Sequence, residues 1–106
     1  MPKYLIRASY TAEGTKGLLK EGGSKRRAVV QEVLAGLGGK LEAFYYAFGE
    51  TDVFAIIDVP DAAAAAAFGL TASASGAVQV STTALITPEE IDGACKKSVK
   101  YRAPGA

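Results

Sequence analysis

An arginine near the start of the chain is the residue best placed to bind a ligand. Residues 3–10, KYLIRASY, alternate so that Arg7 shares one face of a strand with Leu5 and Ser9. A guanidinium among aromatic rings and hydroxyls can hold a carboxylate or a phenolate. Including Arg7, the side chains expected to form this ligand-binding face are Arg7, Ser9, Phe44, Tyr46, Phe54, Ser81 and Thr83. The alternative stays open that Arg7 pairs with a nearby carboxylate or extends to the sheet edge.

Most groups that enzymes use are absent or badly spaced. The chain has no histidine and one cysteine, which argues against histidine-ligated metals, zinc–thiolate sites and iron–sulfur clusters. Asp52 and Asp58 share a strand face but are separated by roughly 20 Å, whereas paired-carboxylate hydrolysis needs about 5–10 Å. Cys95 is expected to be a buried, unreactive side chain, because no histidine can activate it. We therefore predict no cofactor and no metal, and no catalytic residue can be named.

Two residues of the central hairpin are explained by the geometry of its turn. The apolar runs FYYAF and VFAIIDV flank the connector Gly49-Glu50-Thr51-Asp52. Glycine supplies an unusual φ, and an aspartate can accept hydrogen bonds from backbone amides of the turn. Gly49 and Asp52 are therefore interpreted as structural rather than catalytic.

Composition limits the partners of the chain. Its 106 residues make one domain, and 49% hydrophobic with 22% charged residues is typical of globular proteins. A net charge of +1 gives no electrostatic reason to expect nucleic acid or a membrane surface. The basic residues Lys96, Lys97, Lys100 and Arg102 fit either an anion site or cations at a helix C-terminus. Without a signal-peptide pattern, and with a single cysteine, the expected location is cytoplasmic.

Alternating segments and capping residues predict the elements. Strands are expected at residues 3–10, 40–48, 52–59 and 77–87. Thr11 and Ser24 are candidate N-caps of two helices, or of two pieces of one kinked helix, whose charges Lys16, Lys20, Lys25, Arg26 and Arg27 are expected to face solvent. Asp61 caps an alanine-rich helix, and Thr87 with Pro88 begins a last one. The order predicts an α+β, ferredoxin-like βαββαβ sheet with its helices on one face.

The parity of the strands divides the side chains into two faces. The mainly aliphatic set suits packing under helices: Tyr4, Ile6, Ala8, Tyr45, Ala47, Val53, Ala55, Ile57, Val78, Val80 and Ala84. The opposite set contains the seven side chains of the ligand-binding face named above, together with Leu5, Phe48, Ile56 and Leu85. Its aromatic cluster is a poor surface for water. We therefore expect a second copy of the chain to cover it, as a homodimer or a higher homo-oligomer.

The chain resembles the GYD-domain family, within the dimeric α/β-barrel group of ferredoxin-like proteins. The matching segments are KYLIRASYTAEG, the GG after the first helix, FYYAFGETDVFAIIDVPD, SGAVQVSTTALIT and KYRAP. Gly49 and Asp52 of the family motif are kept, but Thr51 stands where the motif has tyrosine. The resemblance implies a single GYD domain over residues 1–100, a tail over residues 101–106, and pairing as a dimeric α/β barrel. The family has no established activity.

Three hypotheses for function follow. The first is a non-catalytic homo-oligomer, with or without a small apolar or anionic ligand between the sheet faces. The alternative is a cofactor-independent monooxygenase- or isomerase-like enzyme acting on an aromatic or polyketide-like substrate, an analogy that rests on the fold alone. An electrostatic binding module ranks last because the net charge is near zero. An RNA-binding sheet is rejected, since DVFAIIDV lacks the basic residue and glycine of such strands.

Overall fold

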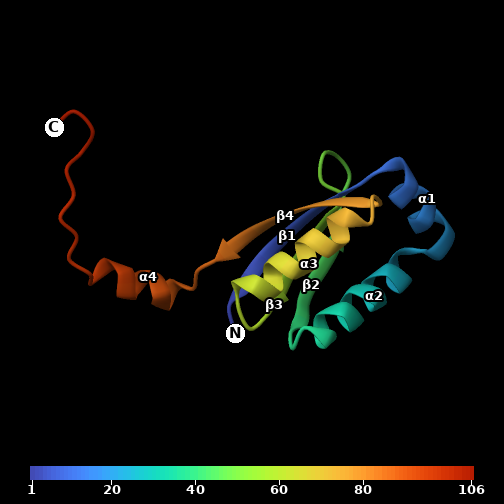
Figure 1. The fold of residues 1–106 in the computed structure, drawn as a ribbon, viewed down its shortest axis with the longest axis horizontal. Coiled ribbons are helices and arrows are strands. Elements are labelled where there is room, and N and C mark those ends of the chain that lie inside the picture. The colour runs from blue at the N-terminus through green and yellow to red at the C-terminus, as the bar shows by residue number, and fades with distance from the viewer.

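Four alternating segments pair into one antiparallel sheet in the computed structural model, which describes residues 1–106 (Figure 1). The strands are β1 Lys3–Tyr10, β2 Lys40–Tyr46, β3 Val53–Asp58 and β4 Val78–Leu85. Their order across the sheet is β2-β3-β1-β4, and every neighbouring pair is antiparallel. The mixed α+β prediction is confirmed, and this order is compatible with a ferredoxin-like fold. Three strands are shorter than expected, since β2 ends at Tyr46, β3 spans Val53–Asp58 and β4 spans Val78–Leu85.

Polar caps fix where three of the four helices begin. The helices are α1 Ala12–Glu21, α2 Gly23–Gly36, α3 Ala62–Ala74 and α4 Pro88–Cys95. As predicted, the side chains of Thr11, Asp61 and Thr87 accept hydrogen bonds from backbone amides of α1, α3 and α4. The expectation that Ser24 caps α2 is wrong, because the helix already begins at Gly23. None of the helices has the length and apolar character needed to cross a bilayer.

A single glycine separates the first two helices. Gly22 has φ 87°, a left-handed conformation that glycine adopts without steric cost, and it ends α1 and begins α2. The question of one kinked helix or two pieces is therefore settled in favour of two. A second glycine, Gly14, lets α1 approach the sheet, since a Cβ there would lie 1.9 Å from the carbonyl oxygen of Ala77.

The strand register assigns each side chain to a face, and it corrects part of the predicted parity. Phe44 is opposite Ala55 and Tyr46 is opposite Val53, so both aromatic rings lie on the helix-covered face. Tyr45, which was expected under the helices, is opposite Phe54 on the uncovered face instead. The reason is that FYYAF is aromatic on both faces. Which face each of its rings takes therefore depends on the shift in β2–β3 register between Leu41 and Ala43. The hydropathy of the segment does not reveal that shift.

The helices cover the edges of the sheet rather than its middle. α2 packs along edge strand β2, α3 packs along the other edge strand β4, and α2 and α3 scarcely touch each other. The buried core beneath them comes mainly from the central strands β1 and β3, with Leu34, Val59 and Ala65. Ile57, Leu34 and Val59 are fully buried. This spacing leaves the central strands without a helix directly above them.

The last part of the chain projects away from the sheet (Figure 1). α4 contains no buried residue, and Ile91, Val99 and Tyr101 expose large apolar side chains. Cys95 is exposed, so the prediction of a buried cysteine is wrong: the apolar stripe of α4 has no other element of this chain to pack against. The radius of gyration is 16.9 Å, whereas a compact chain of this length has about 13 Å.

Candidate functional site

A pocket lies under the helices, above the two central strands. Its volume is about 360 Å³, within the range of small-molecule sites, which is roughly 300–1,000 Å³. The floor is formed by Ile6 and Ala8 of β1 and by Val53, Ala55 and Ile57 of β3, all of them buried. The pocket exists because α2 and α3 stand over the edge strands, and because the alanines of the floor are too short to fill the space between them.

The walls of the pocket are apolar side chains from three helices. α2 contributes Val29, Val30 and Val33, whose spacing places them on one side of the helix. α3 contributes Phe68 and Ala72, which are four residues apart and therefore on one side of that helix. Leu18 and Gly17 of α1 line the same pocket. Of its 23 lining residues, 16 are hydrophobic, so a bound molecule would meet a mainly apolar surface.

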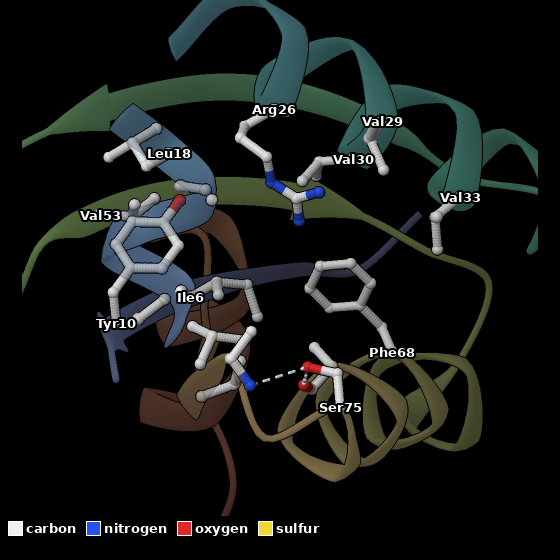
Figure 2. Close-up of a pocket in the computed structure, with 18 of the residues that line it drawn as sticks. Ile6, Tyr10, Leu18, Arg26, Val29, Val30, Val33, Val53, Phe68 and Ser75 are labelled. Atoms are coloured by element: carbon white, nitrogen blue, oxygen red, sulfur yellow. Dashed lines mark hydrogen bonds between the residues drawn. The ribbon is translucent and has the colours of Figure 1, made fainter. Parts of the chain in front are cut away.

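One cation reaches into the pocket. Arg26 is half-buried, and Figure 2 shows its guanidinium extending from α2 into the space above Phe68. The two carboxylates that also line the pocket, Glu13 and Glu21, lie 3.9 Å from Lys16 and 4.0 Å from Lys25. None of the four ion pairs of the molecule includes Arg26. The prediction that Arg26 belongs to the solvated side of its helix is therefore wrong.

An aromatic pair fixes the beginning of α2 beside this pocket. Tyr46 donates a hydrogen bond from its hydroxyl to the carbonyl oxygen of Gly23, at 3.0 Å. The rings of Phe44 and Tyr46 meet edge to face, with centroids 5.2 Å apart. Burial raises the pKa of Tyr46 to about 12, and the phenol of Tyr10 contributes to the same shift. Tyr46 is thus neutral and can donate this bond at all ordinary pH values.

The predicted ligand residues are only partly brought together. Arg7 faces Phe54 on one side and Ser81 on the other, and the neighbouring pair Leu5–Thr83 places Thr83 on the same uncovered face. Phe44 and Tyr46 lie on the other face, as the register shows. Arg7 makes no ion pair; Lys3 instead bonds Asp58 at 2.8 Å and Glu42 at 3.1 Å. These hydrogen bonds, first to Asp58 and then to Glu42, raise the pKa of Lys3.

Ser9 of β1 and the hairpin residues Gly49 and Asp52 have structural roles. Ser9 donates a hydrogen bond to the carbonyl oxygen of Glu50 at 2.6 Å, so its hydroxyl holds the hairpin loop. The amide of Tyr10 donates to the carboxylate of Asp52 at 2.8 Å. Gly49 has φ 141°, which favours glycine. Asp52 therefore ties the loop to β1, rather than bonding amides within the turn as expected.

The spacing of residues in α2 indicates that Arg26 lies on the apolar side of the helix. Arg26 precedes Val29, Val30 and Val33 by three, four and seven residues, so it continues the apolar side of α2. That position places Arg26 on the side of α2 that lines the pocket. The pocket itself has no sequence signal, because it depends on how far apart α2 and α3 stand. No group of histidine, cysteine, aspartate and glutamate side chains is arranged to hold a metal ion.

A comparison with protein-family models places the chain in a family. The protein-family model described as GYD domain matches residues 4–95 of this chain, a range that includes every strand and helix except the first residue of β1, Lys3. No curated protein and no solved structure matches it.

Proposed function

The chain belongs to the GYD domain family, and we propose that it is a non-catalytic homo-oligomeric protein that binds a small, mainly apolar molecule. The observation that carries this proposal is the pocket of about 360 Å³ beneath the helices. Protein interiors are normally close-packed, and apolar side chains around an empty space lose contacts with neighbours. A ligand that filled the pocket would restore those contacts. The binding site we propose is thus under the helices, and not between two sheet faces.

Self-association is supported by the surface that the chain leaves exposed. Its accessible surface is 7398 Å², whereas a compact monomer of its mass has about 5,600 Å². The excess of roughly 1,800 Å² exceeds the area of about 800 Å² that each partner contributes to a standard interface. The exposed apolar residues Tyr45 and Phe54 belong to the uncovered sheet face, and Ile91 and Tyr101 to the projecting segment. A second copy would cover such surfaces.

Binding is favoured over catalysis by the state of the polar groups around the pocket. Glu13 and Glu21 line the pocket and each lies beside a lysine. Tyr46 does not line the pocket, and its phenol holds its proton up to pH values near its pKa of about 12. A general base works best with a pKa near the operating pH. The enzyme alternative, acting on an aromatic or polyketide-like substrate, would use this same pocket. A cytoplasmic location is part of the proposal and fits the free thiol of Cys95.

The pocket is tested by filling it. The probe is 2-naphthalenemethanol, a neutral apolar molecule, titrated calorimetrically into the native protein and into Ala72→Phe. A phenyl ring at position 72 would occupy the space beside Phe68, so we expect binding to the native protein and its loss in the variant. The matched control is Ala67→Phe, an exposed position of the same helix that does not line the pocket, and it should bind as the native protein does. No binding to the native protein, or equal binding to Ala72→Phe, would reject the site.

A further inference from the structure

The carboxylates that line the pocket have basic partners, but the arginine that lines it has no acidic partner. Three charged side chains line the pocket, the cation Arg26 and the carboxylates Glu13 and Glu21, together with the phenol of Tyr10. Both carboxylates have a lysine about 4 Å away, at 3.9 and 4.0 Å, whereas the guanidinium has no carboxylate partner and no hydrogen-bond acceptor in the molecule. The guanidinium nitrogens of half-buried Arg26 are still reached by water, because they are not among the buried polar atoms that lack a partner. Its N–H donors are therefore free to bond a molecule that enters the pocket. An anion in the pocket would supply the missing partner.

The position of Arg26 fits recognition of the head of a ligand whose body lies deeper. Its side chain leaves α2 on the same side as Val30 and Val33, and its guanidinium extends into the space above Phe68 (Figure 2). The floor below is wholly apolar, formed by residues such as Ile6 and Ala55. A molecule that satisfied both parts would have an apolar body on the floor and a negative group at Arg26.

We propose that the pocket binds a small carboxylic acid with an apolar body, and that Arg26 receives its carboxylate. A guanidinium presents parallel N–H groups that match the two oxygens of a carboxylate. Such a bond is stronger among apolar side chains than in water. The hydrogen bond from Tyr46 to Gly23 holds the first turn of α2, and so supports the place from which Arg26 extends. This inference rests on the proposed function, since it names the class of molecule for the same pocket.

The test compares two probes that differ only in the charged group. We titrate 2-naphthoate and 2-naphthalenemethanol into the native protein, Arg26→Gln and Arg27→Gln. A charge-assisted hydrogen bond predicts that the native protein binds the acid roughly tenfold more tightly than the alcohol. Arg26→Gln should remove this preference and leave the affinity for the alcohol within about twofold. Arg27 is exposed and does not line the pocket, so Arg27→Gln should keep the preference.

The outcomes distinguish failure of the role of Arg26 from failure of the pocket as a ligand site. Equal binding of acid and alcohol to the native protein would overturn the role of Arg26 and leave the apolar pocket standing. Equal losses for both probes in Arg26→Gln would also overturn it, because they would show that the side chain is only part of the wall. If neither probe binds the native protein, the pocket fails as a ligand site and this inference fails with it.

Discussion

The central strands of the sheet carry small side chains on the face toward the helices and large ones on the uncovered face. Under the helices, the central strands present Ala8 and Ala55 among larger residues, and a cavity remains above them. On the uncovered face, the same strands present Phe54 and Ile56, and no helix of this chain covers them. The covered face is therefore flanked by helices but incompletely filled above its central strands, and the uncovered face is filled with side chains but has no helix beside it. The first arrangement suits a small molecule, and the second suits a flat protein surface.

The largest expected effect comes from a charge at the centre of the uncovered face. Phe54 is 39% exposed and lies opposite Arg7. An aspartate there would be partly neutralised by Arg7, so we choose Phe54→Lys, which adds a second cation. Burying such a charge between two copies costs several kcal/mol per ion. Sedimentation at low micromolar concentration should show twice the chain mass of 10.9 kDa for the native protein and a folded monomer for the variant.

Phe48 provides the matched control for that substitution. It lies in the loop after β2 and is 105% exposed, so Phe48→Lys places the same charge in water. This variant should keep the native oligomeric state. A native protein that sediments as a monomer, or a Phe54→Lys protein that sediments like the native one, would show that the uncovered face is not the interface.

The next prediction uses adjacent isoleucines on opposite faces. Ile57 is 0% exposed on the covered face, whereas Ile56 is half-buried on the uncovered face. In the monomeric Phe54→Lys background, Ile57→Ala should lower the free energy of unfolding by about 2–5 kcal/mol. Ile56→Ala should cost roughly half of that or less, because its side chain already keeps part of its surface in water. Urea unfolding measures both; equal losses would show that the monomer depends on both faces alike.

The sequence predicts features that neighbouring residues decide. Thr11, Asp61 and Thr87 are correctly identified as caps, because a cap needs only its own side chain and an amide two or three residues later. The element order, Gly49 in the turn and the central position of Phe54 are also correct. Each of these follows from local geometry or from the known pattern of one fold.

The features that sequence missed depend on distances between elements. Phe44 and Tyr46 were assigned to the wrong face because both sides of β2 are aromatic, and one irregularity near Glu42 decides the register. Cys95 was expected in a core, but α4 has an apolar stripe without an element of its own chain beneath it. The pocket arises from the separation of α2 and α3, so only the three-dimensional arrangement shows it.

The smallest expected effect concerns the two neighbouring tyrosines on opposite faces. On the covered face, Tyr46 bonds Gly23 of α2, whereas Tyr45 on the other face makes no side-chain hydrogen bond. Tyr46→Phe should cost about 0.5 kcal/mol near neutral pH, at the low end for a hydrogen bond because this one is exposed. Tyr45→Phe is the control and should leave the free energy of unfolding of the monomer close to the native value.

The same substitution predicts a change in the pH dependence of stability. The pKa of Tyr46 is about 12 in the folded chain, above its ordinary value of 10.0. The unfolded chain therefore releases this proton first as the pH rises, so the contribution is complete below pH 10 and is lost toward pH 12. Lys3, whose pKa is also raised, is present in both proteins, and its effect cancels in the comparison. The native protein should lose stability more steeply than Tyr46→Phe between pH 10 and 12 in urea unfolding. Parallel curves would mean that Tyr46 is no better shielded from water in the folded chain than a phenol is in the unfolded chain, and the burial that raises its pKa would be absent.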